Sequence, residues 1–526
     1  FNVYLHIQTL PLIKYDMKSL FKTVFIIIFF TAITRLLGFI FRIWLSRTIG
    51  TEALGIYQIS FSIFMVLLTL VSSGIPLIIS RMTAKHVANK DTKAEHQTLT
   101  SAIIISLVLS VLICLLVLIF SKPISHIFAD ESCMTILLLL LPALVFSSVY
   151  SAIRGNLWGR NKYVASCSAE LFEQFIRIIV CYLLLCGIWP VFDGAIGAAL
   201  SLSIACVFSC VFVIILYFKS GGKFAKPKNY KEIIKTSSPI TAIRVASSLI
   251  QPVIAIIIPL RLVVAGYTQS QSLSLFGIAT GMTLPLLFIP MTIIGSLSYA
   301  LVPDLSSALA QKDSNYISSR TTTSLVFSLF IAFFIVPIFM GAGENIGSFF
   351  FDNSYSGILL SSSAWIIIPM CLTNISSSIL NAVGLEIKSF KNYIIGSILM
   401  LLCIWFLPKY VGINALTYAM GTCFTISSIL NIRMIKKQVC PSLKLKKYFL
   451  TFFAFLIPTA AITSFSTNIF NNFLPLFFNL AISCSLGATF FILLCIIFNV
   501  FKFSTVLIWL KNNNIVKKPL KNKKRV

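Results

Sequence analysis

Two arginines, Arg35 and Arg42, lie inside an apolar segment, residues 31–50 (TAITRLLGFIFRIWLSRTIG), that has the composition of a membrane-spanning helix. Seven residues make about two helical turns, so the two guanidinium groups share one helix face. An arginine at the membrane centre costs about 2.5–3.5 kcal/mol on insertion scales, and such residues usually face a water-filled or protein-lined interior. We therefore expect them to bind an anionic ligand. The alternative is that they reach lipid headgroups or pair with acids on another helix.

A second charged group lies in the apolar segment 164–187. Glu170, Glu173 and Arg177 are spaced at i, i+3 and i+7, which places them on one helix face, where Glu173 can pair with Arg177. Carboxylates isolated in lipid mostly protonate, so these need a partner or a wet cavity. We predict that they act in coupling or gating, as a cation or proton site or as a gate that pairs with Arg35 or Arg244. A closed ion-pair network that only orients the helix is the alternative.

The segment 239–264 carries Arg244 and Gln251, again seven residues apart on one face. We assign Arg244 to ligand binding and Gln251 to coupling or gating. Pro252 and Pro259 follow, and prolines interrupt the helical hydrogen-bond ladder and let a helix bend. A transporter would flex here, whereas static kinks needed for packing are the alternative.

The four arginines deep in the predicted spans outnumber the two glutamates there. A cationic interior suits an anionic ligand, and a guanidinium group can donate two parallel hydrogen bonds to two oxygens of a phosphate. A cation exporter would be expected to carry a surplus of acids instead. The sequence has no phosphate-binding G-x-x-x-x-G-K-[ST], no H-E-x-x-H and no G-x-S-x-G, and its 13 cysteines include no C-x-x-C. We expect no enzyme activity, no cofactor and no metal site.

The composition places the chain in a membrane. Hydrophobic residues make up 58% of its 526 residues, and its mean hydropathy is +0.95. A soluble protein of this size cannot bury that much apolar surface, so membrane lipids are its expected surroundings. The net charge of +27 lies in short loops between apolar runs, a distribution typical of the cytoplasmic face of a membrane protein rather than of nucleic-acid binding.

Each membrane span needs about 20 apolar residues. The sequence predicts fourteen such spans: 23–46, 54–80, 99–121, 133–153, 164–187, 190–217, 239–264, 275–302, 322–342, 357–383, 390–408, 411–432, 448–468 and 476–503. If the amino terminus is inside, the inside segments hold 33 of the 42 lysines and arginines, and the outside loops hold Arg47, Lys122, Arg261 and Lys409. This bias predicts a multi-pass protein of the cytoplasmic membrane with both termini cytoplasmic.

The spans divide into two similar halves. Thr31-Ala32-Ile33-Thr34-Arg35 resembles Thr241-Ala242-Ile243-Arg244, and six spans separate the two, which predicts parallel repeats. The predicted organisation is an amino-terminal cytoplasmic segment 1–22, of which 1–16 are expected to be an upstream extension, a six-helix bundle 23–217, a basic cytoplasmic linker 218–238, a second six-helix bundle 239–432, two additional helices 433–503 and a basic cytoplasmic tail 504–526.

Residues 34–82 (TRLLGFIFRIWLSRTIGTEALGIYQISFSIFMVLLTLVSSGIPLIISRM) resemble the opening of the stage V sporulation protein B and polysaccharide-export branch of the multidrug/oligosaccharidyl-lipid/polysaccharide superfamily. The blocks 276–308 and 169–180 (AELFEQFIRIIV) resemble two further parts of that branch. The superfamily also contains lipid II flippases and MATE exporters. Arg35 fits the arginine of the family's first helix. Arg42 matches the sporulation-type branch and lies one position from the second arginine of typical lipid II flippases, and Arg244 is matched by its position in its helix.

The resemblance implies an all-α protein with two six-helix bundles in a V plus two further helices, which works by alternating access without ATP. Its implied cargo is a polyprenyl-diphosphate-linked saccharide or peptidoglycan precursor, for cell-wall, spore-cortex or polysaccharide biosynthesis. We expect Arg35, Arg42 and Arg244 to hold the diphosphate, and Na⁺, H⁺ or the membrane potential to drive the cycle. A MATE-type drug/cation antiporter is the alternative.

Overall fold

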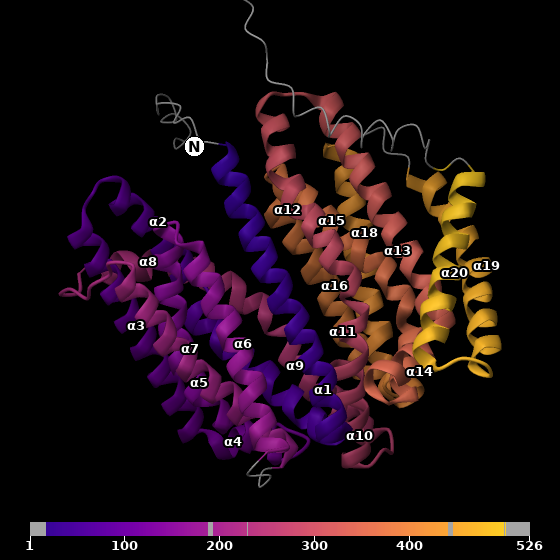
Figure 1. The fold of residues 1–526 in the computed structure, drawn as a ribbon, viewed down its shortest axis with the longest axis horizontal. Coiled ribbons are helices and arrows are strands. Elements are labelled where there is room, and N and C mark those ends of the chain that lie inside the picture. The colour runs from indigo at the N-terminus through magenta and orange to yellow at the C-terminus, as the bar shows by residue number, and fades with distance from the viewer. Residues whose placement is uncertain (1–16, 188–192, 229, 440–444, 499, 501–526) are drawn as a thin grey trace, which may run out of the picture. The chain divides into compact units, whose positions relative to one another are not determined.

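The computed structural model describes residues 17–187, 193–228, 230–439, 445–498 and 500, and every regular element among them is a helix (Figure 1). The prediction of an all-α polytopic protein is therefore confirmed. The predictions for residues 1–16 and for the tail from 504 onward lie outside the described residues.

Within the described residues, twelve helices are long and apolar enough to cross a membrane. The first of them, 60 residues long, joins two predicted spans, because the chain reverses at a non-helical Gly50 inside it. Helix α6 (Tyr163–Leu185) is not among the twelve, since every 18-residue window in it contains three charged residues: Glu170, Glu173 and Arg177. These two differences account for the fourteen spans that the hydropathy predicts.

The chain forms two compact units. Unit 1 runs to Leu260 and also takes in 269–277, and unit 2 consists of 261–268 and the chain from Ile278 onward. The helices of unit 1 are α1 (Met17–Ser72), α2 (Ile75–Ala88), α3 (Thr92–Ile119), α4 (Ser121–Ser125), α5 (Ser132–Gly159), α6, α7 (Gly194–Lys219), α8 (Tyr230–Ser248), most of α9 (Ile250–Val264) and α10 (Gln269–Gly277).

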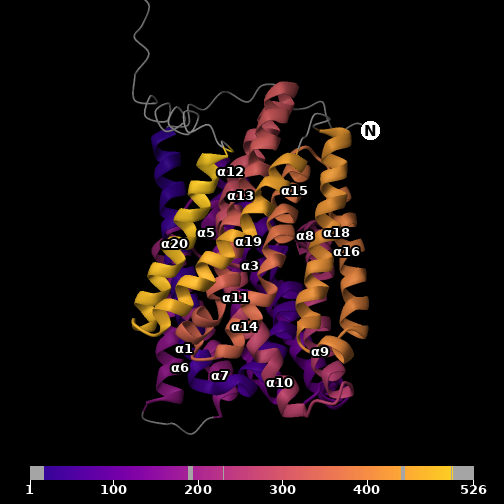
Figure 2. The ribbon, with the colours of Figure 1, turned by 90° about the vertical axis from the view of Figure 1, so that its right-hand side faces the viewer.

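Besides residues 261–268, unit 2 contains a π-helical turn, η1, followed by helices of which the last two are long. Its elements are η1 (Ile278–Thr283), α11 (Leu284–Leu287), α12 (Ile289–Ala310), α13 (Ser314–Phe351), α14 (Ser354–Ser363), η2 (Ala364–Ile366), α15 (Ile367–Ala382), α16 (Glu386–Phe406), α17 (Pro408–Val411), α18 (Asn414–Gln438), α19 (Leu445–Asn471) and α20 (Leu476–Ile497). Helix α16 packs against α18, and α19 packs against α13 and α20 (Figure 2). The predicted domain boundaries remain predictions.

Local sequence explains where several helices begin and turn. Gly50 has φ 78° and ψ 171°, a conformation that a residue with a Cβ rarely adopts, and it divides α1 into two antiparallel spans. Helix α3 begins where the carboxylate of Asp91 accepts a hydrogen bond from the amide of Ala94 (2.9 Å), and Asp313 caps α13 in the same way through Tyr316 (3.0 Å).

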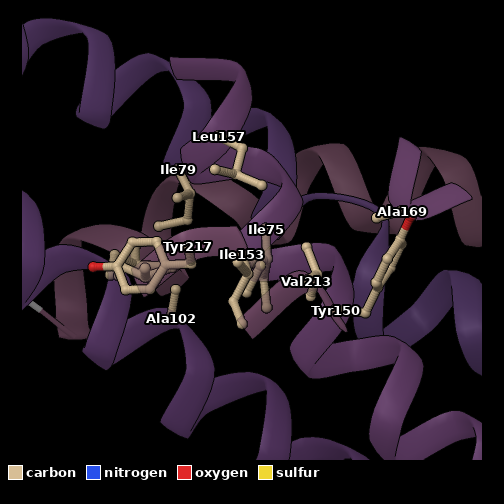
Figure 3. Close-up of a cluster of buried hydrophobic side chains, with 12 residues drawn as sticks. Ile75, Ile79, Ala102, Tyr150, Ile153, Leu157, Ala169, Val213 and Tyr217 are labelled. Atoms are coloured by element: carbon tan, nitrogen blue, oxygen red, sulfur yellow. The ribbon is translucent and has the colours of Figure 1, made fainter. Parts of the chain in front are cut away.

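Each unit has its own core. In unit 1, a cluster of buried side chains joins α2, α3, α5, α6, α7 and α8, with Tyr150 and Tyr217 at its two ends (Figure 3). In unit 2, the rings of Phe330, Phe452 and Phe491 contact one another and join α13, α19 and α20. Phenylalanines bury a large apolar area, so these contacts hold the three helices together.

Candidate anion-binding site

Helices α1 and α6 of unit 1 pack closely and bring the predicted charged residues together. Gly38 lies between Arg35 and Arg42 on α1, and a Cβ built there would be 3.8 Å from the side-chain oxygen of Gln174 on α6. Gln174 is in turn flanked on α6 by Glu173 and Arg177. The α6 residues assigned to coupling therefore lie beside the α1 residues assigned to ligand binding.

Arg42 and Arg177 form a pair of like charges inside unit 1. Arg42 interacts electrostatically with Arg177 and with Tyr57, a residue of the second span of α1. The Nη2 of Arg177 donates a hydrogen bond to the Tyr57 hydroxyl (2.7 Å), and its guanidinium lies over the ring of Phe41 (5.0 Å to the centroid). The Nε of Arg177 is buried and has no hydrogen-bond partner. Buried donors are normally satisfied, so an unpaired donor beside two positive charges favours an anion.

No carboxylate of the described residues forms a salt bridge with this pair, although Glu173 interacts electrostatically with Arg177. The ion pairs within the described part of the chain are Arg154–Glu170 (2.7 Å), Arg160–Glu95 and Arg320–Asp304 (2.8 Å). The sequence allowed an ion pair between Glu173 and Arg177, and the structure does not form it, because Arg177 reaches Tyr57 on the neighbouring helix instead. Glu170 pairs instead with Arg154 of α5.

Glu173 faces α5 and α7, and it forms no salt bridge within the described residues. Its carboxylate accepts one long hydrogen bond, from the hydroxyl of Ser209 on α7 (3.3 Å). Tyr150 of α5 interacts electrostatically with Glu173, and its hydroxyl is buried without a hydrogen-bond partner. A proton or a monovalent cation can be held by groups of this kind: a carboxylate, a serine hydroxyl and a phenol without a hydrogen-bond partner. Sequence reasoning missed Tyr57, Tyr150 and Ser209, although each is a polar side chain within an apolar run.

The remaining predicted residues lie apart from the Arg42–Arg177 pair. Arg35 is exposed on unit 1, about 10 Å along α1 from Arg42, and makes no hydrogen bond to the described residues. Arg244 donates a hydrogen bond to the carbonyl oxygen of Ser73 (3.0 Å). Ser73 lies 16 residues after Tyr57, which is about 24 Å along a straight helix. The structure therefore brings Arg42 and Arg177 together and does not bring Arg244 to them, and Gln251 is exposed on α9.

A buried polar network that the sequence analysis did not find lies elsewhere in unit 1. Glu95 is 3% exposed and accepts hydrogen bonds from Arg160 and from the amide of Asn156 (3.0 Å). The guanidinium of Arg160 also lies over the ring of Tyr217 (5.2 Å), whose hydroxyl donates to the carbonyl oxygen of Lys223 (2.8 Å). The network joins α3, α5 and α7 to the basic linker and holds that linker against the bundle. Among the residues that the structure describes, no group of His, Cys, Asp and Glu has the arrangement of a metal site.

Comparisons with known proteins agree with this architecture. The family model described as "Polysaccharide biosynthesis protein" matches residues 20–309. "Stage V sporulation protein B" of Bacillus subtilis (strain 168) is 24% identical over 451 residues, which cover 83% of this chain and 87% of that protein.

Solved structures show the same fold. The structure titled "Lipid II flippase MurJ, inward closed conformation" superposes with a TM-score of 0.70 at 15% identity, over 90% of this chain and 98% of that one. An inward-facing MATE family transporter of the MOP superfamily superposes with a TM-score of 0.66 at 15% identity, over 78% of this chain and 96% of that one. At these identities the likeness shows the fold.

Proposed function

We propose, from the premise that this chain belongs to the polysaccharide biosynthesis protein family of the multidrug/oligosaccharidyl-lipid/polysaccharide superfamily, that it is a flippase. Its substrate is a polyprenyl-diphosphate-linked saccharide or a peptidoglycan precursor, which it moves by alternating access across the cytoplasmic membrane. Both termini are cytoplasmic in this proposal, as the distribution of lysines and arginines predicts.

The observation that carries the proposal is the pair of Arg42 and Arg177, which has no salt-bridge partner among the described residues. Two like charges within electrostatic range repel each other, and the fold holds them together although Glu173 acts on Arg177 only beyond salt-bridge distance. A diphosphate relieves this repulsion and satisfies the unpaired Nε of Arg177 at the same time. In a protein that binds cations, the same positions would be expected to carry acids.

Arg35 and Arg244 extend this site along the path of the headgroup. Arg35 is two turns from Arg42 on the same helix face, and it contacts the second phosphate or the first sugar in our proposal. Arg244, bound at Ser73, meets the diphosphate at a different stage of the cycle. A diphosphate is too short to bridge about 24 Å, so the two arginine positions act in succession rather than together.

Coupling is assigned to Glu170, Glu173 and Gln251, with Tyr150 and Ser209 as added partners of Glu173. Na⁺ or H⁺ binds at Glu173 in this proposal and changes the charge that faces Arg177. The membrane potential can contribute as well, since moving one charge across 100 mV gains about 2.3 kcal/mol. The same carboxylate would serve a MATE-type drug/cation antiporter, which remains the second candidate.

A leaflet-accessibility assay tests the flippase. The protein is reconstituted in liposomes with a fluorescent undecaprenyl-diphosphate disaccharide, and the fraction that a membrane-impermeant reductant can reach is followed over time. We expect Arg42→Gln and Arg35→Ala to lower the rate at least tenfold, because each removes a charged contact to the diphosphate, worth about 1.5–3 kcal/mol. We expect Arg244→Ala to lower it less, because Arg244 acts at one stage.

Arg320→Gln is the matched control. It removes an arginine that is already paired with Asp304 (2.8 Å) in unit 2, so the flipping rate should stay at the wild-type value. The site would be ruled out if the wild type does not flip the probe, or if Arg42→Gln and Arg35→Ala flip it at the wild-type rate. Proton- or Na⁺-driven efflux of an organic cation by the same liposomes would favour the antiporter.

A further inference from the structure

Unit 2 contains a pocket beside Lys409, at the end of α16 that is opposite Lys388 and Lys391. The pocket has a volume of about 430 Å³ and lies where the turn that follows α9, residues 265–267, meets α17 and Gly412. Its volume falls within the range of about 300–1,000 Å³ that is typical of small-molecule sites. Its lining residues belong to unit 2, whereas Arg42 and Arg177 belong to unit 1.

The walls of the pocket are fixed by backbone geometry and by one side-chain contact. Gly266 (φ 102°) and Gly412 (φ 58°) turn the two segments in a conformation that favours glycine. A Cβ on Gly412 would lie 2.8 Å from the hydroxyl oxygen of Tyr267, so this tyrosine reaches across from one wall to the other. Arg261 donates to the carbonyl oxygen of Trp405 (2.8 Å) and lies over its ring, which ties the end of α9 to the end of α16.

The side chains of the pocket suit a sugar that carries an acid. Tyr267 and Tyr410 offer rings and hydroxyls, and Lys409 offers an ammonium group, while no carboxylate lines the pocket. A tyrosine presents an apolar face, against which the C–H face of a pyranose can pack, together with a hydroxyl that donates and accepts. The ammonium group of Lys409 adds a charged donor for a carboxylate. From this arrangement we propose that the pocket binds a saccharide that carries a carboxylate.

The position of the pocket fits the delivery of such a sugar. Helix α16 has Lys388 and Lys391 near its start and extends 21 residues, about 32 Å, before the chain reaches α17. Helix α18 then returns to Lys436 and Lys437 at its end. The pocket is therefore about one membrane thickness from these basic residues, on the face that the charge pattern predicts to be external. This inference rests on the proposed function and adds a site for the saccharide part of the same substrate.

Aromatic residues also gather at membrane surfaces without any ligand, so the experiment needs a matched aromatic control. Tyr410 is 77% exposed, and Phe473, in the turn between α19 and α20, is 78% exposed and does not line the pocket. Removing either ring takes away the same kind of exposed surface. Only the loss of Tyr410 should change sugar binding.

Isothermal titration of the full-length protein in nanodiscs provides the test. The probes are the N-acetylglucosaminyl-N-acetylmuramic acid disaccharide, which carries a carboxylate, and the neutral disaccharide chitobiose. We expect the acidic disaccharide to bind more tightly than chitobiose. We expect Tyr410→Ala to weaken both by about tenfold, Lys409→Gln to weaken only the acidic one by about tenfold, and Phe473→Ala to change neither.

Absence of binding to the wild type at millimolar acidic disaccharide would overturn the inference, as would equal affinities for the wild type and Tyr410→Ala. The flipping assay keeps this failure distinct from failure of the proposed function. If wild-type liposomes flip the lipid-linked probe while the pocket variants bind sugar as the wild type does, the pocket assignment falls and the flippase stands. If the wild type does not flip it at all, the proposed function falls.

Discussion

The buried ion pair of Glu95 and Arg160 gives the sharpest prediction about stability. The two side chains are 4% and 10% exposed, and Glu95 also accepts a hydrogen bond from Asn156 (3.0 Å). The substitution Glu95→Ala removes the only carboxylate that pairs with Arg160 in the described residues; Arg160 keeps the carbonyl oxygen of Ser220 (3.1 Å) and Asn156 keeps the hydroxyl of Thr83 (3.0 Å), but the guanidinium loses its counter-charge. Breaking a buried pair in this way costs about 3–5 kcal/mol, because an uncompensated charge remains in a poorly hydrated site.

The chain offers a graded series of controls. The Arg320–Asp304 pair is 43% and 30% exposed, so Asp304→Ala should cost no more than about 1 kcal/mol, because water replaces the lost carboxylate. The Arg154–Glu170 pair is 33% and 37% exposed, so Glu170→Ala should also cost no more than about 1 kcal/mol of unfolding free energy.

Equilibrium unfolding of the three purified variants in mixed detergent micelles measures these differences directly. We expect the midpoint of Glu95→Ala to fall well below those of Asp304→Ala and Glu170→Ala. Limited proteolysis should show earlier cleavage near Lys223 in Glu95→Ala, since the network holds the basic linker through Tyr217. Equal midpoints for Glu95→Ala and Asp304→Ala would refute the reasoning that burial decides the strength of these pairs.

Three further outcomes are expected. Glu173→Gln should make the flipping rate independent of an imposed Na⁺ or proton gradient while substrate affinity stays within about twofold, and an unchanged gradient dependence would remove the coupling assignment. Gly55→Ala should destabilise the protein by about 1–3 kcal/mol, because its Cβ would clash with the backbone oxygen of Leu273 in α10. Gly295→Ala, whose Cβ meets open space, should be neutral or stabilising, and similar unfolding midpoints for the two variants would contradict this. Tyr57→Phe frees the Nη2 of Arg177 from its 2.7 Å hydrogen bond and should weaken diphosphate binding about tenfold in titrations, and wild-type affinity would show that Tyr57 does not position Arg177.

The apolar runs allowed the helical architecture to be predicted, because lipid requires long stretches in which the backbone satisfies its own hydrogen bonds. The apolar runs do not indicate which residue a charged side chain contacts. The spacing of Glu173 and Arg177 permits an ion pair on one helix. In the structure, Arg177 instead donates a hydrogen bond to Tyr57 of α1, 120 residues away in sequence. The choice depends on how α1 packs against α6, which periodicity within a single helix does not specify.

One ion pair could have been predicted from the turn between its helices. Arg154 and Glu170 lie at nearly equal distances from the turn between α5 and α6, and Asp304 and Arg320 lie at equal distances from Lys312. Residues placed symmetrically about the turn of an antiparallel helix pair face each other, so the Asp304–Arg320 pair follows from the predicted spans that end at 302 and begin at 322. The predicted spans 133–153 and 164–187 place their turn about four residues too early, so the Arg154–Glu170 pair follows only from the helix bounds of the structure. The pairing of Glu95 with Arg160 spans 65 residues and three helices, and no local pattern indicates it.

The central claim is that Arg42, beside Arg177, binds a diphosphate inside unit 1. The most direct measurement compares the affinity of the purified protein for undecaprenyl diphosphate and undecaprenyl monophosphate, in the wild type and in Arg42→Gln. We predict that the wild type prefers the diphosphate by at least tenfold and that Arg42→Gln loses this preference, because the adjacent pair of guanidinium groups that holds the diphosphate is then broken. An unchanged preference in Arg42→Gln would contradict the account.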